Sequence, residues 1–230
     1  MTPAFKLWAA TFLAVAVFTL IAISWLDRPI ALLLHGMFGG RPVPAGVIRS
    51  PGLSIPLIAS SVFVAFGLAA LIGRQFSKLE TVVLLCTVGV LAAEVIKNQL
   101  KFVFGRTWPD SWEPGITSLV RDNVYGFYFF HGGQSLESFP SGHAAVAAAV
   151  ISVLWISYPK LRMAYAICIS AADLGLVLLN LHFLSDVVSG TFVGISAGWF
   201  TVAVWRATRD RRVLWDSNNS APPTTLQKSG

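Results

Sequence analysis

Six apolar runs in this 230-residue chain have the length, or nearly the length, needed to cross the hydrocarbon core of a membrane. A transmembrane helix needs about 20 predominantly apolar residues to cross roughly 30 Å. The chain is 55% hydrophobic and 12% charged, whereas a soluble domain carries about a quarter charged residues. The sequence therefore predicts an all-α integral membrane bundle of six transmembrane helices. These spans are expected near Trp8–Trp25, Ile55–Ile72, Thr81–Phe104, His143–Ser157, Met163–Leu181 and Val187–Trp205.

The distribution of Lys and Arg predicts the orientation of this bundle, because both residues favour short cytoplasmic loops. If Lys6 is on the cytoplasmic side, the bases of two connections between spans and of the C-terminal tail fall on that side as well. An even number of spans also puts both ends of the chain on that side. Both termini are therefore predicted to be cytoplasmic. The bases are Arg74, Lys78, Lys160, Arg162, Arg206, Arg209, Arg211 and Arg212.

Residues 1–216 are predicted to form one membrane domain, followed by a tail at 217–230. The tail is rich in Ser, Asn, Thr and Pro, a composition typical of disorder. A loop at 105–139 interrupts the apolar spans and contains many aromatic residues, which favours an ordered structure at the outer membrane face. The first apolar run is too long for a typical signal peptide and is interpreted as a membrane anchor. Cys86 and Cys168 lie within spans and are expected to be packing residues.

Three charged residues share one face of the third span. Glu94, Lys97 and Lys101 are spaced at i, i+3 and i+7, and charges inside a membrane face the bundle interior or a watery cavity. Glu94 and Lys97 are compatible equally with a structural ion pair and with a functional role. Lys101 lies five residues before Arg106, so these two bases are expected to bind a common phosphate-sized anion.

A short polar turn opens the fourth span. Pro140 and Gly142 favour a tight entry, and Ser141 is a good N-cap. The first backbone N–H groups of the helix then point outward and favour an anion. His143 at this helix start is expected to reach a bound oxyanion.

A second histidine motif precedes the sixth span. His182 and Asp186 are spaced at i and i+4 and would be adjacent on one helical face. A carboxylate that binds one ring nitrogen leaves the other free to attack, which indicates a histidine nucleophile. Two histidines and a carboxylate also suit zinc, but Lys101 and Arg106 would oppose a divalent cation, so no metal and no cofactor are expected.

These motifs together resemble the type-2 phosphatidic acid phosphatase superfamily, which also contains vanadium haloperoxidases and bacterial undecaprenyl-diphosphate phosphatases. The resemblance covers roughly Glu94 to Gly194 and is carried by three segments: Lys101-x6-Trp108-Pro109, Pro140-Ser141-Gly142-His143 and His182-x3-Asp186. It implies that His182 attacks phosphorus to form a phosphohistidine and that Asp186 orients it. It further implies that His143 protonates the leaving oxygen, and that Lys101, Ser141 and Gly142 hold the phosphate.

Two positions depart from the family pattern K-x6-R-P and S-R-x5-H-x3-D. Trp108 stands where the first motif has Arg, and Gly175-Leu176 stands where the third has Ser-Arg. Arg106 is the expected replacement, gripping the phosphate with both terminal nitrogens, and the secondary candidates are Arg121, His131 and Asn180. Trp108 itself is interpreted as an interfacial anchor in preference to a substrate-stacking residue.

The resemblance implies a multi-pass cell-membrane enzyme, in a bacterial inner membrane, whose active site faces the outer or periplasmic side. Its expected reaction is metal-free hydrolysis of a lipid mono- or diphosphate, such as phosphatidic acid, phosphatidylglycerophosphate or a prenyl diphosphate. The expected partners are this lipid and the bilayer, and no nucleic acid. Two alternatives stay open: a lipid phosphotransferase that uses the same histidine, with the acceptor bound by the 105–139 loop, and a catalytically inert lipid-binding or transport relative.

Overall fold

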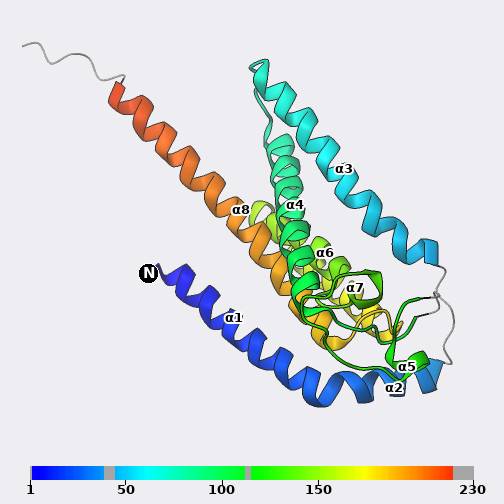
Figure 1. The fold of residues 1–230 in the computed structure, drawn as a ribbon. Helices are drawn as coiled ribbons and strands as arrows, with labels where there is room; N and C mark the ends of the chain where they lie inside the picture. The colour runs from blue at the N-terminus through cyan, green and yellow to red at the C-terminus, as the bar shows by residue number, and fades with distance from the viewer. Residues whose placement is uncertain (1, 39–44, 112–114, 220–230) are drawn as a thin grey trace, which may run out of the picture.

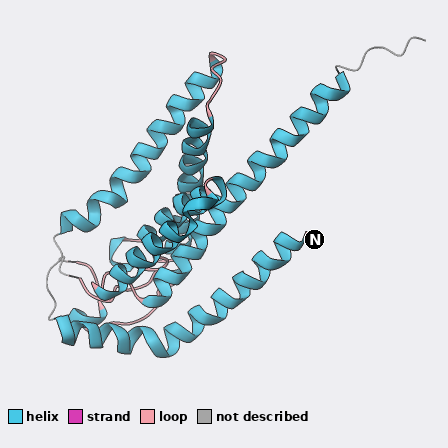
Figure 2. Cartoon of the chain, turned by 180° about the vertical axis from the view of Figure 1, so that it is seen from behind, coloured by secondary structure: helices cyan, strands magenta, loops and turns pink. Residues whose placement is uncertain are grey.

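The computed structural model describes residues 2–38, 45–111 and 115–219 of the chain. Within them the regular elements are helical, and no strand occurs beyond isolated bridges at Arg106 and Trp108 (Figures 1 and 2). This confirms the predicted all-α class. The α-helices are α1 (Pro3–Ile21), α2 (Asp27–Phe38), α3 (Ala45–Leu71), α4 (Lys78–Phe104), α5 (Leu119–Asp122), α6 (Gly142–Ser157), α7 (Arg162–Leu178) and α8 (Leu184–Asn219). A π-helical turn, Ala22–Leu26, joins α1 to α2, and short 3-10 turns lie at Gln134–Leu136 and Pro159–Leu161.

Five helical segments of the described chain are long and apolar enough to cross a membrane, one fewer than predicted. They are Pro3–Phe38, Ser54–Leu71, Lys78–Phe104, Pro159–Leu178 and Leu184–Arg209. The fourth predicted span corresponds to α6, which has 16 residues. This helix is shorter than the five membrane-crossing segments because it begins at the Ser141 cap, within the folded end of the bundle.

The centre of the bundle consists of α4, α6 and α8. Small and branched side chains meet there, among them Val90, Ala93, Val146, Ala149 and Ala197. On α8, glycines recur every four residues and face α6 (190, 194 and 198). A Cβ at Gly194 would collide with the carbonyl oxygen of Ala145, and one at Gly190 would collide with that of Ser141. Because these positions lack side chains, the two backbones approach closely.

Local signals explain where the central helices begin and end. Ser77 and Glu80 form a capping box that starts α4. Gly105 ends the same helix in the left-handed conformation at φ 53°, and a Cβ there would collide with the carbonyl oxygen of Tyr128. The chain therefore turns sharply after Phe104, and the end of α4 lies beside the starts of α6 and α8 (Figure 1).

The segment after α4 is ordered by its own backbone hydrogen bonds. Leu119 N–H donates to the carbonyl of Trp108 at 2.8 Å, and Tyr128 N–H donates to that of Gly105 at 2.7 Å. Aromatic rings of this segment also pack against the end of α4, where the ring centroids of Phe104 and Phe139 lie 5.0 Å apart. The described part of the predicted outer loop is thus a folded cover for one end of the bundle.

The C-terminal helix is longer than the sequence predicted. α8 continues to Asn219, three residues into the stretch expected to be a disordered tail. The remainder of that tail, residues 220–230, lies outside the described residues.

Candidate active site

His182 and Asp186 meet at the start of α8. Both are buried, at 2% and 0% exposure of the side chain, and His182 Nδ1 lies 3.7 Å from Asp186 Oδ2. His182 precedes the helix, so the pairing does not come from two residues on one helical face. Instead, the Asp186 carboxylate turns back and accepts the N–H of Phe183 at 3.1 Å, as the third residue of a capping box does. Nε2 of His182 is then the ring nitrogen directed away from the carboxylate.

The Asp186 side chain is fixed by further hydrogen bonds. Ser138 Oγ donates to Oδ2 at 2.6 Å. The backbone links the same residue to the turn before α6, because Ser141 N–H donates to the Asp186 carbonyl at 3.0 Å. The two predicted histidine motifs are therefore joined directly through Asp186.

The turn at the start of α6 has the predicted form. Ser141 is the N-cap, and its side chain accepts the N–H of Ala144. Gly142 is the first residue of the helix, and His143 follows on its first turn. The His143 ring lies 6.0 Å from the His182 ring, centroid to centroid. The structure thus brings the predicted acid and the predicted nucleophile to the same place.

Lys101 reaches this place from α4, with Trp108 beside it. The Lys101 ammonium lies 5.8 Å from the centroid of the Trp108 ring, and that ring lies 5.1 Å from His182. Trp108 therefore contacts the candidate nucleophile, which differs from the purely interfacial role preferred from the sequence. An indole at this position supplies an apolar wall and a cation–π surface where the family pattern has a guanidinium.

Lys97 of α4 lies against Gly142 at the amino end of α6. Its ammonium pairs with Glu94 at 3.0 Å, and its side chain is 11% exposed. A Cβ added to Gly142 would lie 3.2 Å from the Lys97 Nζ, so the absent side chain of Gly142 leaves room for this lysine. Glu94 and Lys97 therefore form an ion pair, and this pair lies against the amino end of α6.

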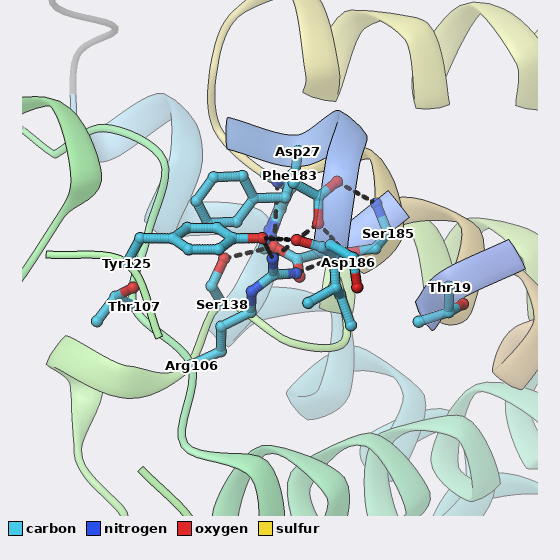
Figure 3. Close-up of polar contacts among 12 residues, drawn as sticks. Thr19, Asp27, Arg106, Thr107, Tyr125, Ser138, Phe183, Ser185 and Asp186 are labelled. Atoms are coloured by element: carbon cyan, nitrogen blue, oxygen red, sulfur yellow. Dashed lines mark hydrogen bonds and ion pairs between the residues drawn. The ribbon is translucent and has the colours of Figure 1, made fainter. Parts of the chain in front are cut away.

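Arg106 has partners other than the predicted phosphate. Its side chain has 0% exposure, and its two terminal nitrogens bind two carboxylates: Nη2 donates to Asp27 at 2.7 Å, and Nη1 donates to Asp186 in a short contact. Nη1 also donates to Ser185 Oγ at 2.6 Å, and Nη2 to the Tyr125 hydroxyl at 3.1 Å. Figure 3 shows the guanidinium between the two carboxylates. A bidentate grip on phosphate would need the donors that Asp27 and Asp186 occupy.

Asp27 also lies in this network and is not among the site residues predicted from the sequence. It is fully buried at the first position of α2, directly after the π-helical turn, and it accepts the N–H of Ser185 at 3.0 Å. Its partners lie far away in the chain, which hides the contact from any spacing argument. The available signal was a lone acidic residue at the end of a long apolar run, because a charge in such a place needs a buried partner.

The secondary candidates have local structural partners. Arg121 binds Asp122 and backbone carbonyls of its own loop. Asn180 donates to the carbonyl of Ala31 at 3.1 Å, and the exposed His131 lies with Nδ1 2.8 Å from the carbonyl of Phe129. In the described part of the chain, no group of three or more His, Cys, Asp or Glu side chains is arranged as a metal site.

The environment of His182 favours the neutral ring. Burial, which disfavours the imidazolium, lowers the pKa of His182 below its ordinary value and outweighs the opposing effect of Asp186. Nearby Lys101 acts in the same direction as burial. A neutral imidazole retains the lone pair that a nucleophile needs.

Comparison with known proteins gives a consistent family match. A family model described as the PAP2 superfamily matches residues 81–210. Two lipid A 1-phosphatases, from Rhizobium etli and Rhizobium johnstonii, are 29% and 28% identical over 113 residues, or 49% of this chain. The matched segment spans less than half of each relative, at 44% and 42% of their lengths. The crystal structure of a PAP2-type phosphatidylglycerolphosphate phosphatase from Bacillus subtilis aligns with a TM-score of 0.41 and 16% identity, covering 85% of this chain and 96% of that one.

Proposed function

Because the chain belongs to the PAP2 superfamily, we propose that it is a membrane-embedded phosphatase that hydrolyses a lipid mono- or diphosphate through a phosphohistidine. One observation carries the proposal: the buried His182–Asp186 pair faces His143 at the end of an apolar helical bundle. The two relatives named as lipid A 1-phosphatases support a lipid phosphate as the substrate class.

In the first step, Nε2 of neutral His182 attacks phosphorus. The new N–P bond forms as the bond between phosphorus and the lipid oxygen breaks, and protonated His143 gives its proton to that oxygen. Positive charge develops on the His182 ring, and Asp186 stabilises it. Nδ1 and Oδ2 lie 3.7 Å apart, longer than a hydrogen bond, so this mechanism requires the pair to close when substrate binds.

In the second step, water attacks the phosphohistidine. His143, now neutral, takes a proton from this water, the N–P bond breaks, and its electron pair returns to the His182 ring. Inorganic phosphate leaves, and both histidines regain their starting protonation states. His143 thus serves as acid and then as base.

The negative charge of the phosphoryl group requires donors that replace the two missing family arginines. Lys101 and the amino end of α6, with Ser141 and Gly142, supply part of this set. We assign Lys97 to it as well, because its ammonium lies against Gly142. A cation at the amino end of a helix is disfavoured by the helix dipole unless an anion is present, so Glu94 supplies the counter-charge before substrate binds.

An apolar groove of about 540 Å³ supports a lipid as the substrate. It lies between α1, α4 and α8, and one of its walls includes Leu100, the neighbour of Lys101. An acyl or prenyl chain in this groove would remain in the bilayer while its phosphate lies near Lys101. Its other wall residues include Trp8, Phe12, Ile96, Phe192 and Phe200.

The arrangement of basic residues supports an outer-facing site with both termini inside. The start of α1, the end of α8 and the α3–α4 connection with Arg74 and Lys78 all lie away from the site end of the bundle (Figures 1 and 2). If these bases mark the cytoplasmic side, the site opens on the opposite face.

A phosphate-release panel on detergent-purified protein in EDTA tests the function. We expect phosphate release from at least one of phosphatidic acid, phosphatidylglycerophosphate, undecaprenyl diphosphate and a lipid A 1-phosphate. The lipid A substrate is assayed first, because the Rhizobium relatives are named lipid A 1-phosphatases. Activity lost in EDTA and restored by a divalent cation would contradict the metal-free mechanism. Radiolabel that passes to an added acceptor lipid instead of to water would identify the phosphotransferase alternative.

Replacement of Lys97 by Met tests the assigned phosphate contact. We expect KM for the lipid phosphate to rise about 10- to 100-fold, because a hydrogen bond to a charged group contributes about 1.5–3 kcal/mol. The matched control is Lys78→Met at the other end of α4, where the lysine lies over the Tyr158 ring. If Lys97→Met and Glu94→Gln lowered thermal stability equally and left KM unchanged, the pair would be purely structural.

A further inference from the structure

The N-terminal helical segment contributes one buried carboxylate to the site. Asp27 Oδ2 accepts from Arg106 Nη2 at 2.7 Å and from the Ser185 hydroxyl in a shorter contact, while Oδ1 accepts the Ser185 N–H at 3.0 Å. Asp27 lies outside residues 81–210, which the family model matches. The N-terminal segment is therefore connected to the candidate catalytic residues by hydrogen bonds as well as by apolar packing.

The charges in this cluster do not balance. One guanidinium, Arg106, lies between the carboxylates of Asp27 and Asp186, and all three side chains have 0% exposure. Among these three side chains, two negative charges share one positive charge, and the Lys101 ammonium is the nearest further cation on the Asp186 side. Unpaired buried charge is costly, so the cluster favours a further positive charge nearby. His182, at 3.7 Å from Asp186, is the adjacent group that acquires positive charge in the proposed reaction.

Sharing Arg106 affects how strongly Asp186 can act on His182. If Asp27 were absent, both terminal nitrogens of Arg106 would be free to bind Asp186, and a bidentate pair would neutralise that carboxylate. With Asp27 present, Nη2 of Arg106 binds Asp27 and is not available to Asp186. Ser185 Oγ links Arg106 to Asp27, because it accepts from Nη1 and donates to the Asp27 carboxylate. Asp186 then retains negative charge toward the imidazole.

We propose that Asp27 is a positioning residue of the active site, which restrains Arg106 so that Asp186 stays negatively charged and correctly placed against His182. This inference rests on the proposed function of the same site. Tyr125 assists, because its hydroxyl accepts from Arg106 and donates to the backbone carbonyl of Ile23 in the π-helical turn before Asp27. The π-turn places the Asp27 carboxylate inward at the point where α1 gives way to α2.

The other groups that face His182 determine which measurement is informative. They are Asp186 on α8, Lys101 on α4 and His143 on α6, with Arg106 behind Asp186. Removing the Asp27 charge changes none of them directly. It makes the surroundings of His182 more positive, so protonation of the ring becomes harder and the pKa of His182 falls further.

Asp27→Asn is the test variant, assayed beside Asp110→Asn. Asp110 is a matched control, because it also links α2 to the same loop, through His35 at 3.2 Å, but has no contact with Arg106 among those described. We expect Asp27→Asn to lower kcat about a hundredfold, the cost of a misplacement near 1 Å, with KM close to that of wild type, because a positioning residue that acts on the chemical step does not change uniform substrate binding. The acid limb of the pH profile should move to lower pH in this variant, and Asp110→Asn should match wild type in all three quantities.

Two results would overturn the inference. The first is a wild-type kcat together with an unshifted acid limb of the pH profile. The second is a lowered kcat with an unshifted acid limb, because that combination indicates a role in folding only. If Asp27→Asn does not give monodisperse protein, Asp27→Ser removes the same charge and is judged by the same two readouts. The pKa of His182, followed by NMR of ¹⁵N-labelled histidine in wild type and variant, gives a readout that needs no turnover. Wild-type protein that released no lipid phosphate would defeat the proposed function, whereas an unshifted His182 pKa would defeat only the role of Asp27.

Discussion

His182→Ala is expected to abolish lipid phosphate release, with kcat reduced about 10⁵- to 10⁶-fold, the scale seen when a catalytic nucleophile is removed. The reason is that the proposed reaction forms its only covalent bond to the protein at Nε2 of this residue. Rapid-quench experiments with ³²P-labelled substrate should show an acid-labile, base-stable phosphoenzyme in wild type and none in the variant.

The matched control for this substitution is His131→Ala. His131 is exposed, and its Nδ1 lies beside the carbonyl of Phe129 in its own loop. This variant should turn over at the wild-type rate. Residual activity of His182→Ala within a hundredfold of wild type would exclude His182 as the nucleophile, and His143 would then be tested for the phosphoenzyme.

Arg106→Met is expected to lower the free energy of unfolding by about 3–5 kcal/mol, because breaking a buried ion pair leaves uncompensated charge. Here two carboxylates, Asp27 and Asp186, would lose their shared cation. Activity should fall with stability, since Asp186 would no longer be held against His182. Thermal unfolding in detergent and steady-state kinetics measure the two effects.

Arg121→Met is the matched control in the same loop. The Arg121 side chain is 39% exposed and pairs with Asp122, so its loss should leave the thermal unfolding midpoint close to that of wild type. The same measurements separate the two interpretations of Arg106. If Arg106 bound the phosphate, as the sequence suggested, its replacement would raise KM and leave the unfolding free energy unchanged.

Residues that are neighbours in sequence were the ones that the sequence could place. Ser141, Gly142 and His143 share one turn, and the structure brings them beside His182 and Asp186 as the motif spacing indicated. The all-α class followed from apolar runs alone, because segments of such length leave no other way to satisfy the backbone in lipid. The bounds of α6 were predicted to within one residue, but at 16 residues it is not among the helices long enough to cross a membrane, because an apolar run does not show whether it lies in lipid or within protein.

The site contacts that could not be predicted join residues far apart in the sequence. Arg106 was assigned to phosphate because it follows Lys101 closely, but its donors are occupied by carboxylates 79 and 80 residues away. Nothing in the local pattern around Asp27 indicates Arg106 as its partner. Likewise, Lys97 pairs with Glu94 as its spacing allowed, whereas its contact with Gly142 depends on how α4 and α6 pack.

The glycines of α8 that face α6 have a consequence for mutational tolerance. They let the helix that carries His143 lie directly against the helix that carries Asp186, so the placement of these two residues depends on packing at positions as far along α8 as residue 198. A single methyl group at residue 194 would collide with the carbonyl oxygen of Ala145 and push the two helices apart, although residue 194 lies about two helical turns beyond Asp186. Tolerance to substitution in this chain therefore does not increase simply with distance from the reaction, and a residue buried in the membrane interior can be as constrained as the histidines.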